Sequence, residues 1–160
     1  MKKLITMFVC VILTTGIAVG QEKGVKWETD MSKGIDASIK SGKPMLLFFT
    51  GSDWCGWCKK LQREVFFTPE FEKWATENVV LMELDFPRRT AISEELRKQN
   101  SEMQQMFGVR GYPTIWFVNP TMNKETNQVN FGQIGKTGYV AGGPPGWIGA
   151  AEKILAESKN

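Results

Sequence analysis

The sequence predicts an α/β domain with a central mixed β-sheet flanked by helices. Two apolar runs, 44–50 and 79–86, are bounded by turn residues and have the length of buried strands. Segments with helical spacing and recognisable caps alternate with these runs. Two further strand-like runs, 114–118 and 128–134, are joined by a polar turn and followed by a last helix. Strands that alternate with helices and then close with a hairpin predict a mixed sheet.

Residues 1–20 have the order of a secretory signal peptide. Lys2 and Lys3 form a basic start, an apolar run covers 4–19, and the small residues at 18–20 provide a cleavage site. The run is shorter than the roughly 20 apolar residues that a membrane-spanning helix needs. An uncleaved anchor that tethers the protein to a membrane is the alternative. Cys10 would be removed with the leader.

The expected mature chain, 21–160, has the size of one domain. Removal of Lys2 and Lys3 lowers the formal net charge from +3 to +1, because the leader contains no acidic residue. No run of Lys or Arg exceeds two residues, so nothing indicates a surface for nucleic acid. No dimerisation segment is evident, and a monomer is expected.

Local signals place the first elements. A short strand is expected at 25–28 and a helix at 30–41. The apolar run 44–50 is expected to be buried on both faces, as in a parallel sheet. Asp53 is expected to cap the helix that begins near Trp54.

Further caps follow along the chain. Thr68 and Pro69 have the pattern of an N-cap followed by proline at the first helical position. Ser93 is expected to cap a helix over 94–107, and Pro144 to open the last helix. Positions in the core or at its rim are expected for Trp27, Trp74, Trp116 and Trp147, with Ile148, Ala151 and Leu155 on the inner side of the last helix.

Cys55 and Cys58 form a C-x-x-C pair at the expected start of a helix. As a structural staple the pair is weak, because a loop of about four residues gives roughly 2 kcal/mol in the loop-entropy relation. A cysteine at a helix N-terminus is stabilised as thiolate, which is the nucleophile in disulfide exchange. The pattern therefore predicts that Cys55 attacks a substrate disulfide and that Cys58, one turn later, resolves the mixed disulfide.

Other uses of a C-x-x-C pair need further ligands. A structural zinc site needs four Cys or His ligands, and the chain has no histidine and three cysteines in all. Covalent haem attachment needs histidine at position 59, which is Lys59. An inert structural disulfide remains the alternative. No cofactor or metal is expected, because the two cysteines carry the electrons.

Segment 49–60, FTGSDWCGWCKK, resembles the active-site stretch of thioredoxin-like proteins. It is most similar to exported thioredoxin-family proteins and to the C-terminal domain of membrane thiol:disulfide interchange proteins. The resemblance continues through Val65-Phe66, 79–85, the segment FGVRGYPT at 107–114, and 135–143, and so covers essentially all of the mature chain. It implies the thioredoxin-like fold.

The resemblance also implies a binding surface beside the redox pair. In the family, the proline before the fourth strand is cis and lies against the cysteines, which here is Pro113. A cis peptide would expose the backbone of Tyr112 for pairing with the extended chain of a substrate. Trp54 is expected either to support the site by apolar packing or to contact the substrate. Trp57, within the loop, is expected to be exposed and to touch substrate or tune the thiols.

One feature departs from the family. Thioredoxins carry a buried carboxylate on the central strand that exchanges a proton with the resolving cysteine. Run 44–50 contains no acid, and Phe48 is expected at the matching position. Asp53 and Glu64 are the nearest carboxylates in sequence.

Together these features predict an exported, periplasmic thiol–disulfide oxidoreductase. It would exchange the Cys55/Cys58 pair with protein substrates, as a reductase or interchange carrier that a membrane electron donor keeps reduced. A disulfide oxidase or isomerase is one alternative. A peptide-binding or chaperone-like module with the same fold is the other, although a pure binder has no need of the second cysteine.

Overall fold

The most apolar run of the chain forms the centre of the sheet. β2 (Met45–Thr50) is buried at all six positions. It pairs in parallel with β3 (Val80–Asp85) and antiparallel with β4 (Thr114–Met122). β1 (Trp27–Glu28) and β5 (Val129–Thr137) complete the strand order β1-β3-β2-β4-β5. The predicted mixed sheet is confirmed.

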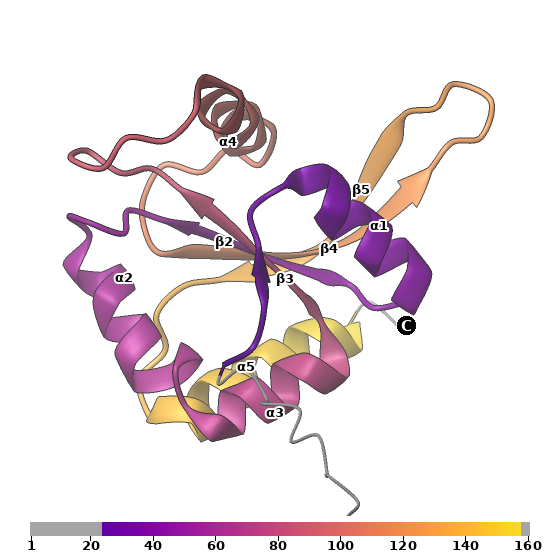
Figure 1. Cartoon of the computed structure of the whole chain (residues 1–160). Coiled ribbons are helices and arrows are strands. Elements are labelled where there is room, and N and C mark those ends of the chain that lie inside the picture. The colour runs from indigo at the N-terminus through magenta and orange to yellow at the C-terminus, as the bar shows by residue number, and fades with distance from the viewer. Residues whose placement is uncertain (1–23, 158–160) are drawn as a thin grey trace, which may run out of the picture.

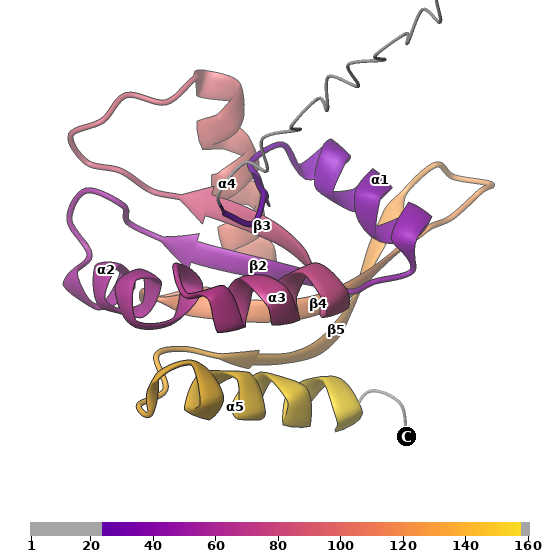
Figure 2. The same ribbon diagram turned by 60° about the horizontal axis from the view of Figure 1, so that its bottom comes forward.

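The computed structural model describes residues 24–157, so the predicted leader at 1–20 and Cys10 lie outside the described residues. The helices are α1 (Met31–Ser41), α2 (Gly56–Leu61), α3 (Pro69–Asn78), α4 (Glu94–Met106) and α5 (Gly143–Glu157), with a π-helical turn, η1 (Gln62–Phe66), directly after α2. Figures 1 and 2 show α1 and α4 on one face of the sheet and α2, α3 and α5 on the other. In the described part, no helix is both long and apolar enough to cross a membrane.

Side-chain caps begin three helices where the sequence predicts. The Asp30 carboxylate accepts the Ser32 and Lys33 N–H groups, Thr68 accepts from Phe71, and Ser93 accepts from Leu96. These bonds satisfy N–H groups that have no partner within the helix. The predicted starts of α1, α3 and α4 are therefore confirmed.

The C-terminal hairpin is longer than predicted. β4 continues from Val118 to Met122 and β5 from Ile134 to Thr137, where the sequence predicts a turn and a loop. Asn119, Thr121 and Met122 are exposed, so backbone pairing rather than burial holds this end of the strand. The apolar pattern ends before the strand does, and Figure 1 shows the hairpin extending beyond the helices.

Two cores fill the spaces between the sheet and its helices. The core beneath α2, α3 and α5 is centred on Trp147, which is fully buried. Its ring packs edge-on against Phe66, Phe71 and Trp74 at centroid distances of 5.2, 5.6 and 6.0 Å. Its Nε1–H donates to the Gly138 carbonyl at 3.0 Å, which satisfies the indole nitrogen. α5 is therefore fixed to the same core that carries α2.

Replacement of Trp147 by alanine is expected to lower the free energy of unfolding by about 3–5 kcal/mol, because it opens a cavity among these aromatic rings. Urea denaturation followed by circular dichroism measures the change. Trp57→Ala is the matched control, since Trp57 is 58% exposed. The control is expected to change stability by under about 0.5 kcal/mol. Equal losses in the two variants would contradict this description of the core.

Candidate active site

The cysteine pair lies where the chain leaves β2 and enters α2. Cys55 is the N-cap of α2, and its Sγ accepts the Cys58 N–H at 3.2 Å. The two sulfurs form a disulfide. Cys55 is 6% exposed and Cys58 is completely buried. Cys55 is thus the cysteine nearer to solvent, and its sulfur faces the N–H groups of the opening helix, which favour the thiolate form when the pair is reduced.

Hydrogen bonds from the end of β3 hold the loop that precedes Cys55. The Asp85 carboxylate accepts the backbone N–H of Ser52 at 2.8 Å and its hydroxyl at 2.6 Å. The Trp54 Nε1–H donates to the Phe86 carbonyl at 2.8 Å. A side chain at Gly51 would collide with the Trp54 ring, so glycine is required at this close approach. The loop therefore has one fixed path from the central strand to the helix.

Asp53 does not cap α2, and that prediction is wrong. Its carboxylate accepts three backbone N–H groups from the loop after β3, those of Arg88, Arg89 and Thr90, at 2.6–3.2 Å. These bonds, with that of Arg88 the largest contribution, lower the pKa of Asp53 from 3.8 to about 2. The cap is Cys55 itself, so Asp53 is free to hold the neighbouring loop against the site.

Aromatic and cationic side chains surround the pair. Trp54 is half-buried, with its ring edge-on to Tyr112 at 5.6 Å and the Arg88 guanidinium 3.9 Å from its centroid. Trp57 is exposed, as predicted, and its ring lies 5.2 Å from that of Tyr139. The Lys60 ammonium is 4.9 Å from both the Trp57 and Tyr139 rings. The structure therefore places both cations on aromatic rings next to the cysteines in the sequence.

The Tyr112–Pro113 segment directly precedes β4 and lies beside the cysteine loop. The peptide bond between these residues is cis. The Tyr112 hydroxyl accepts a hydrogen bond from Gln104 Nε2 at 2.5 Å, which ties the segment to α4. Beside Pro113 is an open groove of about 490 Å³, whose lining includes Val109, Arg110, Trp116 and Lys136. The contact between Trp54 and Tyr112 joins this segment to the cysteine loop.

Sequence reasoning missed a carboxylate on the strand next to β2. Phe48 is buried behind the site and lies in the same core as Cys58. Its register partner on β3 is Glu83, which is partly buried. Burial, followed by the charge of Asp85, raises the pKa of Glu83. An acid in the apolar half of a strand is the signal that could have found it. Within 24–157, no group of three or more acidic or cysteine side chains could hold a metal ion.

Comparisons with known proteins agree with this geometry. The thioredoxin-like domain family matches residues 31–129. The disulfide bond reductase DsbH of Chlamydia pneumoniae is 33% identical over 117 residues, which cover 73% of this chain and 69% of that protein. A solved structure of a DsbH oxidoreductase superposes with a TM-score of 0.72 at 29% identity and covers 83% of this chain and 85% of its own.

A more distant structure shares the fold. The C-terminal domain of Neisseria meningitidis DsbD, in its oxidised form, superposes with a TM-score of 0.50 at 19% identity. The alignment covers 81% of this chain and 98% of that domain. The predicted thioredoxin-like fold is confirmed by these matches.

Asp53→Asn is expected to release the 88–90 loop, because the neutral amide accepts these N–H groups more weakly than a carboxylate does. The folded pKa of about 2 lies below the ordinary 3.8. The charge therefore stabilises the loop fully above about pH 4, and this contribution is lost as the pH falls through about 2. NMR titration of the Arg88, Arg89 and Thr90 amide protons in the wild-type protein measures the midpoint of this loss, and the same titration of Asp53→Asn should show no transition there.

Asp36→Asn, an exposed substitution on α1, is the control and is expected to leave these amide signals unchanged. Amide shifts that titrate near pH 4 would show that Asp53 does not bind the loop.

Proposed function

Since this chain belongs to the thioredoxin-like domain family and is a thiol–disulfide oxidoreductase, we propose that it acts as a protein disulfide reductase or interchange carrier. The observation that carries the proposal is the Cys55–Cys58 disulfide at the opening of α2. The Chlamydia pneumoniae relative, 69% of which is aligned with this chain, is named a disulfide bond reductase. This name supports electron flow from the protein to the substrate.

The proposed reaction has two exchange steps. The Cys55 thiolate attacks one sulfur of the substrate disulfide, forms a mixed disulfide and releases the other substrate sulfur as a thiolate. Cys58 then loses its proton and attacks Cys55, which forms the Cys55–Cys58 bond and releases the second substrate thiolate. Two electrons pass from the protein to the substrate. The order is supported by exposure, since Cys55 is 6% exposed and Cys58 is fully buried.

The proposed substrate surface runs along Trp54, Trp57, Tyr112 and Pro113. Tyr112 and Pro113 precede the paired residues of β4, and an extended substrate chain would pair with the Tyr112 backbone there. The exposed face of Trp57 would contact the substrate on the other side of the cysteines. Both contacts suit a polypeptide partner.

The reducing direction also agrees with the residues between the cysteines. The two residues between the cysteines are Gly56 and Trp57, and neither is a histidine. A histidine at one of these positions would further stabilise the thiolate and make the disulfide more oxidising. We therefore place the oxidase and isomerase alternatives second. A reductase must itself be reduced, and for an exported protein the donor would have to pass electrons across a membrane.

We further propose that residues 1–20 are a signal peptide and that the domain works as a monomer in the periplasm. The basic start and apolar run of the leader support export. Mass spectrometry of the protein from cell envelopes would identify its first residue. A chain that begins at Met1 in the membrane fraction would instead support a tethered form.

Wild-type protein is expected to accelerate the reduction of insulin by dithiothreitol several-fold, because Cys55 attacks disulfides faster than a free thiol does. Turbidity of the released insulin chains measures the rate. Cys55→Ala is expected to abolish the acceleration, and Asp36→Asn, an exposed substitution on α1, serves as a control outside the site. A wild-type protein that holds insulin chains in solution without reducing them would favour the chaperone-like alternative.

Cys58→Ala is expected to accumulate mixed disulfides with substrate proteins, because the mature chain has no other cysteine to resolve them. Non-reducing gels of the variant, expressed in its own compartment, should show higher-mass bands that disappear with reductant. The Cys55→Ala/Cys58→Ala double variant is the matched control and should show none. A single monomer band from Cys58→Ala, with Cys55 intact, would contradict the assigned roles.

A further inference from the structure

Both tryptophans beside Cys55 carry a cation on the ring. The Arg88 guanidinium lies 3.9 Å from the Trp54 centroid, and the Lys60 ammonium lies 4.9 Å from the Trp57 centroid. Trp54 directly precedes Cys55 in the chain, and Trp57 follows it by two positions. The cysteine that is proposed to attack the substrate is therefore bracketed in the chain by two tryptophan–cation pairs.

A third pair lies in the groove beside Pro113. The Lys136 ammonium is 5.3 Å from the Trp116 centroid, and both residues line this groove of about 490 Å³. Arg110, which is exposed, also lines it, and no acidic side chain does. The groove adjoins the cysteine loop, because the Tyr112 ring contacts that loop. Its charge is therefore positive, like that of the two pairs beside the cysteine.

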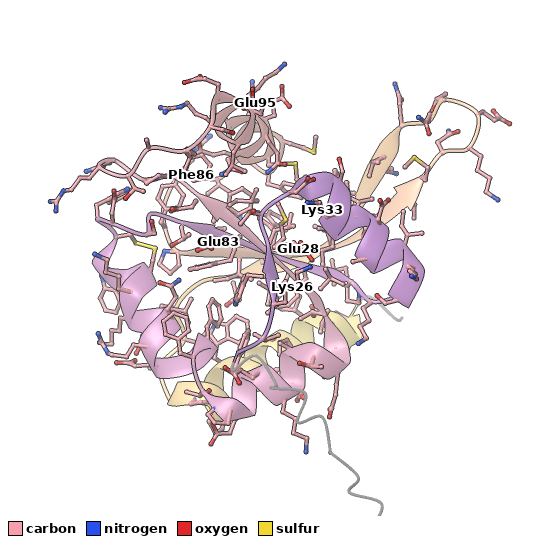
Figure 3. All side chains as sticks on the ribbon, viewed as in Figure 1. Lys26, Glu28, Lys33, Glu83, Phe86 and Glu95 are labelled. Atoms are coloured by element: carbon pink, nitrogen blue, oxygen red, sulfur yellow. A yellow bond between two sulfur atoms is a disulfide. The ribbon has the colours of Figure 1, made fainter. Side chains whose placement is uncertain are left out.

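Cations elsewhere in the described chain pair with acids instead. The ion pairs within residues 24–157 lie on β1, at the start of α1 and on α4: Lys26–Glu28, Lys33–Asp30, Arg97–Glu94 and Lys98–Glu102. In Figure 3, the labelled Lys26, Glu28 and Lys33 lie over β1 and α1, away from the yellow sulfur bond beside α2. The side chains of Arg88, Lys60 and Lys136 form no ion pair and donate no hydrogen bond within the same residues.

The acids near these cations are bonded to other groups. Lys60 and Glu64 are four positions apart, a spacing at which lysine and glutamate pair on a helix. Glu64 instead accepts the Tyr139 hydroxyl at 2.7 Å, and the Lys60 ammonium lies 4.9 Å from the Tyr139 centroid. Asp53 accepts backbone N–H groups, and Asp85 accepts from the cysteine loop. The cations are thus left to pair with acids of another molecule.

A cation on an aromatic ring is well prepared to bind a carboxylate. A guanidinium has five N–H donors and an ammonium has three, and contact with the ring face leaves donors available. The ring also holds the cation in place, so that less side-chain entropy is lost when a partner binds. Opposite charges on two molecules raise the rate at which they associate.

We propose that the three tryptophan–cation pairs select protein substrates whose polypeptide carries acidic side chains around the reacting disulfide. The inference rests on the proposed function and adds the class of polypeptide that the site prefers. Arg88 and Lys60 would contact carboxylates next to the disulfide. Lys136 and Arg110 would contact carboxylates further along the extended chain, in the groove. A polypeptide is the occupant, because the reacting disulfide brings its own neighbouring residues to these rings.

Three peptides that share one disulfide and differ only in the residues beside it, glutamate, glutamine or lysine, test the proposal. Quenched-flow mixing with reduced protein, followed by alkylation and mass spectrometry, gives the second-order rate constant. Each rate constant is divided by that of dithiothreitol with the same peptide, which corrects for the reactivity of the peptide itself. At about 0.02 M salt, the glutamate peptide is expected to react roughly tenfold faster than the glutamine peptide. The lysine peptide should be the slowest. At about 0.5 M salt the three rates should converge, because salt screens the charges.

The triple variant Lys60→Gln/Arg88→Gln/Lys136→Gln is expected to lose most of the preference for the glutamate peptide. Its readout is the ratio of the glutamate to the glutamine peptide within one protein, so that any effect on the thiols cancels. The Arg88 backbone N–H that Asp53 accepts is kept. Arg88→Gln alone, at an exposed position, should lower the ratio in part and repeats the test with one surface substitution.

The matched control is Lys40→Gln/Lys73→Gln/Lys153→Gln, which removes the same charge from exposed positions on α1, α3 and α5. It should keep most of the preference. Equal rates for the three peptides in wild type, or an equal loss in both triple variants, would overturn the proposal. So would binding to phosphatidylglycerol vesicles that the site variant loses, without any preference among peptides, since the cations would then serve a membrane surface. Failure of the reduced wild-type protein to react with any peptide would instead overturn the proposed function.

Discussion

The site depends on one constraint, the attachment of the cysteine loop to the end of β3. Four residues before Cys55 carry the chain from the central strand to the helix, and three of them bond to β3 or to the loop after it. Ser52 bonds to Asp85, Trp54 to Phe86, and Asp53 to the 88–90 backbone. With this path fixed, the sulfur of Cys55 stays at the opening of α2, where the N–H groups that stabilise a thiolate are directed.

The fold and the redox pair could be predicted from the sequence because their signals are local. A long apolar run marks β2, and Thr68 with Pro69 marks the start of α3. The role of Asp53 could not be predicted, because its partners lie about 35 positions further along the chain. A residue that suits an N-cap by local rules is used here for a tertiary contact. The hairpin was predicted too short for a related reason, since its outer pairs are held by backbone bonds that leave no apolar pattern.

Glu83 illustrates a different limit of sequence reasoning. The absence of an acid from 44–50 is visible in the sequence, but the register that places Glu83 opposite Phe48 is not. Strand order and register together bring an acid from β3 to the position beside the central strand.

The direction of electron flow is the central claim, and the reduction potential of the Cys55–Cys58 pair tests it most directly. Equilibration with defined dithiothreitol or glutathione buffers, followed by alkylation and mass spectrometry, gives the fraction of reduced protein. A potential near roughly −270 mV, as in thioredoxin, is the result expected for a reductase. A potential near roughly −120 mV would mean that the reduced form is strongly favoured, and the protein would then be an oxidant of thiols.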